Sequence, residues 1–120
     1  MAEWKLGVVE SRFADIIWEN EPLSTAELVK LCETRLEWKR TTTYTVLKRL
    51  SERGLFKNEE GVVSACLSRD EFYARQSEQV VEESFAGSLP AFVAAFTARK
   101  SLTADEVAEI RRLIDTYEEV

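Results

Sequence analysis

Hydrophobic residues recur three or four positions apart near the start of the chain, which is the spacing of one side of a helix. The pattern predicts an amphipathic helix over about residues 6–20, and Pro22 marks its end. The apolar positions of this helix are Leu6, Val9, Phe13, Ile16 and Ile17.

The next segment, LSTAEL, has the polar and apolar positions of a helix start. Ser24 fits the N-cap and Glu27 the third helical position, where each side chain can satisfy the other residue's backbone amide. Leu23 and Leu28 fit the apolar pair that flanks such a capping box. A second helix is therefore predicted to begin near residue 25.

Residues 39–57, KRTTTYTVLKRLSERGLFK, predict a third helix with two unlike sides, and Gly54 is placed to end it. The side that we expect to be buried holds Thr43, Val46, Leu47 and Leu50. The opposite side holds Thr41, Tyr44, Thr45 and Lys48, with Thr42 and Arg49 beside it.

The segment LFKNEEGVVSACL has β-branched and apolar residues around Glu60-Gly61, which predicts a short β-hairpin. Capping residues then predict a helix over about 69–86, a short one after Ser88, and a last one over about 104–118.

Three short helices followed by a hairpin is the layout of a winged helix-turn-helix, whose third helix enters the DNA major groove. The predicted fold class is therefore mainly α. We expect a winged helix-turn-helix DNA-binding domain with a small β-hairpin wing over residues 1–68. An α-helical dimerisation domain is expected over residues 69–120.

Positive charge is concentrated in the third predicted helix, although the chain carries a net charge of −6. Six of the nineteen residues from 39 to 57 are basic and only Glu52 is acidic, whereas acids outnumber bases before and after this segment. Basic and hydroxyl side chains suit DNA, because cations replace the counterions of the phosphates and hydroxyls donate to phosphates or base edges. The candidate DNA-binding residues are Arg40, Thr41, Thr42, Tyr44, Thr45, Lys48, Arg49 and Arg53.

Two other interpretations of this helix stay open at this point. Basic residues on a helix are often only its solvated face. A winged helix can also dock a protein partner without binding DNA, because a fold does not fix a function.

Residues 85–117 contain more large apolar side chains than a few short helices can easily bury within one chain. Such a patch usually marks a partner surface, so we expect a homodimer; the alternative is that these side chains fold back onto the winged helix as one core. The candidate dimerisation residues are Phe85, Leu89, Phe92, Val93, Phe96, Val107, Ile110, Leu113, Ile114 and Tyr117.

The chain of 120 residues contains no histidine, and its two cysteines, Cys32 and Cys66, form no ligand-like cluster. It thus lacks the commonest general base and the commonest metal ligand. We expect no enzyme activity, no metal site and no cofactor. Cys32 is expected to be a buried thiol, and Cys66 to lie in a strand and to be more exposed.

The longest apolar stretches are far shorter than the roughly 20 residues that span a bilayer. The N-terminal MAEWKLGVVE lacks the basic and then apolar segments of a secretory signal. We therefore expect a cytoplasmic protein without membrane insertion.

Four stretches resemble, in order and spacing, the penicillinase-repressor family of transcriptional regulators. They are LGVVESRFADIIW, EPLSTAEL, WKRTTTYTVLKRLSERGL and GSLPAFVAAF, and the resemblance runs from Leu6 to about residue 118. It implies a homodimeric repressor whose winged helix reads half of a palindromic, inverted-repeat operator in double-stranded DNA, blocking the promoter until it is induced.

The resemblance also implies regulatory partners for some members, and the chain departs from their patterns. A membrane sensor-protease system cleaves the β-lactam-responsive members between Asn and Phe, but Ala95 precedes Phe96 here. The chain has no C-terminal cysteine motif of the copper-responsive kind. Lys39-Arg40 replaces a Ser-Pro-like helix cap, and the predicted wing tip is acidic at Glu59 and Glu60.

Overall fold

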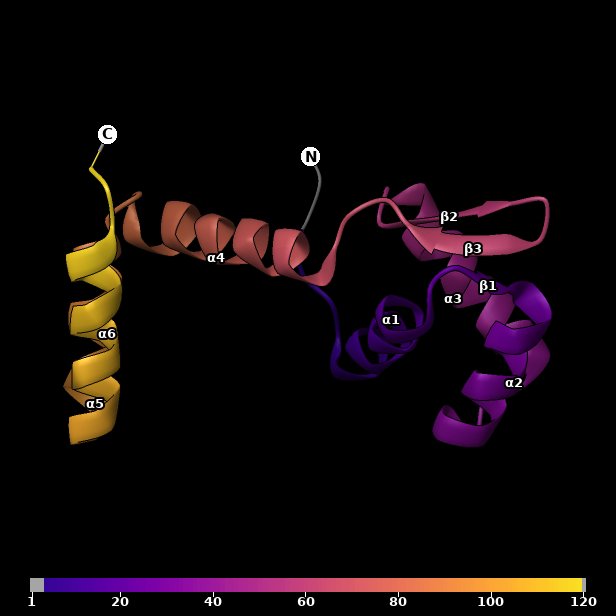
Figure 1. Ribbon diagram of the computed structural model, residues 1–120, viewed down its shortest axis with the longest axis horizontal. Coiled ribbons are helices and arrows are strands. Elements are labelled where there is room, and N and C mark those ends of the chain that lie inside the picture. Colours follow the sequence, from indigo (N-terminus) through magenta and orange to yellow (C-terminus); the bar gives the residue numbers. More distant parts are fainter. Residues whose placement is uncertain (1–3, 120) are drawn as a thin grey trace. The chain divides into compact units, whose positions relative to one another are not determined.

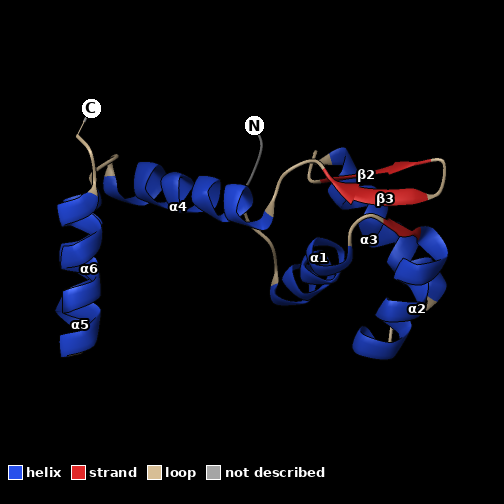
Figure 2. Ribbon diagram, in the orientation of Figure 1, coloured by secondary structure: helices blue, strands red, loops and turns tan. Residues whose placement is uncertain are grey.

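The computed structural model describes residues 4–119 and confirms the predicted fold class (Figure 1). Figure 2 distinguishes the helices, in blue, from the small sheet, in red. The elements are α1 Val8–Asn20, β1 Leu23–Ser24, α2 Thr25–Leu36, α3 Arg40–Glu52, β2 Phe56–Glu59, β3 Val62–Ala65, α4 Arg69–Phe85, α5 Leu89–Arg99 and α6 Ala104–Thr116.

Two compact units make up the chain, residues 1–79 and residues 80–120, so the division falls inside α4. The first unit contains the winged helix and the first turns of α4. The predicted domain boundary after residue 68 coincides with the start of α4 and stays a prediction.

Side-chain caps set where the first helices begin. Gly7 is the N-cap of α1 and donates its N–H to Glu10 Oε1 (3.1 Å), so the helix starts at Val8 rather than at the predicted residue 6. The predicted capping box of α2 is confirmed: Glu27 N–H donates to Ser24 Oγ, and Ser24 N–H donates to Glu27 Oε1, both at 3.1 Å. The Ser24 side-chain cap stabilises α2 by about 1 kcal/mol.

The end of α3 depends on a glycine. Gly54 has φ +84°, a conformation that side chains with a Cβ rarely adopt. Its N–H donates to Ser51 O (3.0 Å) and Leu55 N–H donates to Leu50 O (3.1 Å), which is the Schellman arrangement. Leu50 and Leu55 are both buried, so the residues on either side of this turn contribute side chains to the core.

The sheet has the order β1-β3-β2 and is antiparallel throughout. The predicted hairpin is confirmed as β2 and β3, joined at Glu60-Gly61. Sequence patterning missed β1, because two residues are too few to show an alternating pattern; Leu23 pairs with Val63. Cys66 lies just beyond β3 rather than within a strand, and it is exposed as expected.

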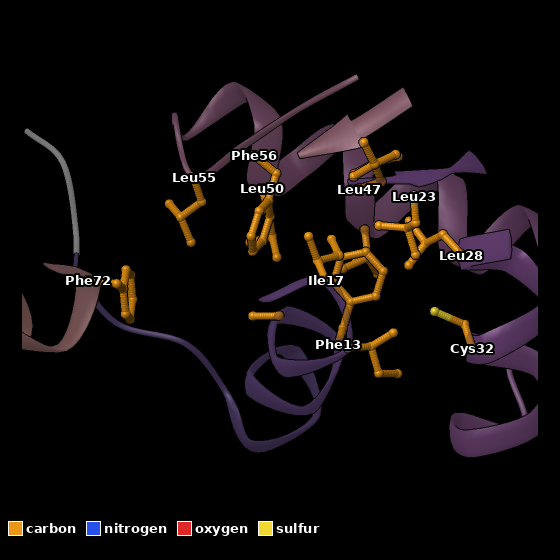
Figure 3. Packing of buried hydrophobic residues seen from close by; sticks show 14 residues of the cluster. Phe13, Ile17, Leu23, Leu28, Cys32, Leu47, Leu50, Leu55, Phe56 and Phe72 are labelled. Carbon is orange, nitrogen blue, oxygen red and sulfur yellow. The ribbon is translucent and has the colours of Figure 1, made fainter. Parts of the chain in front are cut away.

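One hydrophobic core joins the elements of the first unit (Figure 3). Every apolar position on the predicted inner side of α3 is buried, which confirms its orientation. Trp18 extends the core toward α4, since its indole N–H donates to Leu67 O (2.9 Å) and its ring lies 5.8 Å from that of Phe72. The fully buried members of the core include Phe13, Ile17, Leu28, Cys32, Leu50, Val63 and Phe72.

The second unit has a different character. Within its described residues, 80–119, no side chain is buried. Its helices are nevertheless well bounded: Ser88 Oγ accepts from Ala91 N–H (3.1 Å), and Thr103 and Glu106 form the predicted capping box. Local signals thus define these helices without a core behind them. In the described part of the chain, no helix is both long and apolar enough to cross a membrane.

Two neighbouring valines on β3 provide a test of the core. Val63 is fully buried and Val62 is 47% exposed. We expect Val63→Ala to lower the free energy of unfolding by about 1.5–3 kcal/mol, because buried methyl groups are lost and a cavity remains. Val62→Ala is the matched control and should change it by less than about 0.5 kcal/mol. Urea unfolding followed by tryptophan fluorescence measures both; equal losses would contradict the assigned register.

Candidate nucleic-acid interface

The outward side of α3 is exposed along its length. Thr41, Thr45 and Lys48 follow one another at helical spacing opposite the buried side, and all three side chains are exposed. Thr45 Oγ1 donates to Thr41 O (2.9 Å), which leaves its lone pairs free to accept. Glu52, one turn beyond Lys48, is also exposed and ends the basic stretch with an acid.

The N-terminus of α3 has no side-chain cap among the described residues. Its N-cap is Lys39, which forms no side-chain capping bond. The side chains of Arg40, Thr41 and Thr42 in the first turn are exposed. Backbone N–H groups and the helix dipole therefore favour an anion at this end.

One flank of α3 faces the start of α2. The Arg40 guanidinium lies 5.7 Å from the ring centre of Tyr44. A hydrogen bond from the Thr25 side chain, and then the neighbouring Arg40, lower the pKa of the Tyr44 phenol below its ordinary value. Thr25 N–H also donates to Gly61 O (3.0 Å), so α2 joins α3 to the hairpin turn. Sequence analysis missed Thr25, because only the fold brings these three segments together.

The other flank of α3 faces the residues before α1 and its first turn. Arg49 Nη2 lies 3.2 Å from Glu10 Oε2, and Arg53 Nη2 donates to Lys5 O (2.7 Å). Both arginines were predicted to bind DNA, and the structure places them on the side of the helix rather than at its outward centre. Sequence reasoning gave no signal for these partners, which lie about forty or more residues away.

The same N-terminal segment also contacts α4. Trp4 N–H donates to Gln79 Oε1 (2.8 Å), the Trp4 ring lies 5.9 Å from Phe72, and Arg75 stacks over it at 5.0 Å. The residues before α1 therefore touch both Arg53, the C-cap of α3, and α4 within the first unit.

The tip of the wing is acidic. Glu59 and Glu60 are exposed, and the Lys57 ammonium is already paired with Glu59 at 3.3 Å. A phosphate backbone would gain little from this tip, because Lys57 is matched by a carboxylate and Glu60 adds a second negative charge.

A model of the penicillinase repressor family matches residues 6–116, nearly the whole chain. The chain belongs to this family. The methicillin resistance regulatory protein MecI of Staphylococcus aureus is a relative, 19% identical over 116 residues, an alignment that covers 93% of this chain and 94% of that protein. Penicillinase repressors are transcriptional regulators, so the winged helix described above belongs to a DNA-binding repressor family.

The candidate dimerisation residues of this chain are all at least partly exposed. Leu89, Val93 and Phe96 recur on one side of α5. The centre of the Phe92 ring lies 5.5 Å from that of Phe85 and 6.4 Å from that of Phe96. On α6 the exposed apolar residues are Ile110, Leu113 and Ile114, followed by Tyr117, with Val107 half-buried.

The cysteines differ in accessibility. Cys32 is buried against α3, and burial raises the pKa of its thiol despite a hydrogen bond with Thr43 that lowers it. Such a thiol is a weak nucleophile. Among the described residues, no group of three or more potential ligands could hold a metal ion.

Removal of the Thr25 hydroxyl tests the contact between Thr25 of α2 and Tyr44 of α3. We expect Thr25→Val to raise the pKa of Tyr44 toward its ordinary value of 10.0, because the hydrogen bond that stabilises the phenolate is lost. Alkaline titration of tyrosine absorbance, with Tyr44→Phe to identify the signal, measures the change. Thr25→Ser keeps the hydroxyl and should leave the pKa low; an unaltered Thr25→Val titration would refute the contact.

Proposed function

We propose that this chain acts as a homodimeric transcriptional repressor that binds an inverted-repeat operator through α3 and thereby blocks a promoter. Membership of the penicillinase repressor family supports regulation of transcription. The observation that carries the assignment to α3 is its two-sidedness: apolar residues bury one side, and Thr41, Thr45 and Lys48 are left exposed on the other.

Different parts of α3 suit different contacts. Thr42 and Tyr44 suit contacts to bases and to the sugar-phosphate backbone, because their hydroxyls can donate. Thr45 suits base contacts, because its oxygen can accept from a base N–H and its methyl group can touch a thymine methyl. Arg40, Lys48, Arg49 and Arg53 are the proposed phosphate ligands. The uncapped N-terminus of α3 adds backbone N–H donors for a phosphate, whereas Glu52 makes the last turn unfavourable for one.

The helices of residues 80–119 suit a self-association surface. Their apolar side chains lie on α5 and α6 with none of them buried, and such a patch in water favours a partner. A twofold dimer would place two α3 helices about one DNA turn, roughly 34–36 Å, apart, which matches two half-sites of an inverted repeat. The sensor-protease partner stays a prediction that Ala95 disfavours.

Lys48 provides the test of DNA binding. Lys48→Ala should weaken binding to a mixed-sequence DNA duplex by about threefold to tenfold at low salt, and should reduce the salt slope by about 0.9, because one phosphate contact is lost. Fluorescence anisotropy over a salt series measures both. Lys30→Ala, an exposed lysine on α2, serves as the control. A wild-type protein without salt-dependent binding would refute the proposed function.

Leu113 provides the test of the dimer. This side chain is 59% exposed, and Arg112 lies on another side of α6. Leu113→Ser should raise the dimer dissociation constant by about tenfold or more, because the dimer interface loses one leucine from each of its two protomers. Sedimentation equilibrium measures the constant, and Arg112→Ser should leave it nearly unchanged. Equal dimer dissociation constants for the two variants would mean that Leu113 lies outside the dimer interface.

A further inference from the structure

The Glu10 carboxylate connects the first turn of α1 to α3. Its Oε1 accepts the Gly7 N–H at 3.1 Å, and its Oε2 lies 3.2 Å from Arg49 Nη2. The Glu10 side chain is 25% exposed and that of Arg49 is 55% exposed. The acid is therefore the more fixed member of the pair, held by a backbone amide, and the arginine is the member that solvent and ligands can reach.

Arg49 lies on the flank of α3, next to its outward side. It follows Lys48, which lies at the outward centre of α3, and it precedes Arg53 on the same flank by one turn. Arg53 Nη2 donates to the carbonyl of Lys5. Arg49 faces a full negative charge, the carboxylate of Glu10.

A paired arginine is a poor phosphate ligand. Its charge is already matched, so it releases fewer counterions from DNA than a lone cation does. To bind a phosphate, Arg49 must either leave Glu10 or bring the carboxylate close to the negatively charged backbone, and both cost free energy. The single N–O contact at 3.2 Å is breakable, because half-exposed ion pairs contribute little.

We propose that Glu10 is a built-in competitor of DNA: it holds Arg49 in the free protein and must release it before Arg49 binds phosphate. This inference rests on the proposed function of α3. It makes Glu10 a positioning residue that lowers general affinity for DNA. A repressor whose non-specific affinity is low spends less of its time on the large excess of non-operator sites.

Glu10→Gln tests the competitor, because the amide oxygen keeps the bond to Gly7 and only the charge is lost. With a mixed-sequence duplex at low salt, we expect binding to tighten by about 1.5-fold to fivefold, the range of an exposed ion pair. The salt slope should steepen by up to about 0.9, since Arg49 then neutralises a phosphate in every complex, whereas in the wild-type protein Glu10 keeps it paired in part of them. Fluorescence anisotropy over a salt series gives both values.

Glu19→Gln is the matched control, since it removes the same charge from the same helix but faces Arg35, 4.0 Å away on α2. It should leave affinity nearly unchanged. Arg49→Gln should abolish the gain caused by Glu10→Gln, because the competitor then has nothing to release. In the otherwise wild-type protein, Arg49→Gln should weaken binding less than Lys48→Gln, a comparison that does not require a Glu10 variant.

Several results would overturn the inference. Unchanged or weaker binding of Glu10→Gln would mean that Glu10 is neutral or orients Arg49 for DNA. An equal gain in the Arg49→Gln background would mean a general charge effect. Failure of the proposed function is distinguishable, because the wild-type protein would then lack salt-dependent DNA binding altogether.

Discussion

The burial of one side of α3 against α1, α2 and the sheet is the constraint on which the candidate interface depends. Leu47 and Leu50 are almost completely buried. Because one side of the helix is fixed in the core, the orientation of its opposite side is fixed as well. Thr45 and Lys48 are thus presented to solvent by packing on the far side of the same helix. Fixing them in this way spares much of the ordering cost that a flexible basic loop would pay on binding DNA.

Contacts on both flanks of α3 come from distant parts of the chain. Thr25 reaches Tyr44 on one side, while Lys5 and Glu10 reach Arg53 and Arg49 on the other. These contacts decide which cations are available and which are already engaged. The number of basic residues in the segment therefore overstates the charge that α3 offers to a phosphate backbone, since carboxylates match part of it.

The second unit follows different physics. Its helices are set by local caps such as Ser88 and Thr103, and the described residues beyond 79 bury no side chain within the chain. Helices of this length gain most of their stability from packing on an apolar side. The exposed apolar residues of α5 and α6 therefore supply a reason for two copies to associate, and association would in turn stabilise the helices that carry them.

The sequence by itself determined the helices, the hairpin and the inner side of α3, because caps, glycines and the helical period act over a few residues. It predicted the Ser24 box, the Gly54 terminus, the hairpin at Glu60-Gly61 and the buried leucines correctly. Only the tertiary structure decided that β1 pairs with β3 and that Glu10 meets Arg49. Those pairings join segments far apart in the chain, and no local pattern encodes them, since they exist only once the core has brought the segments together.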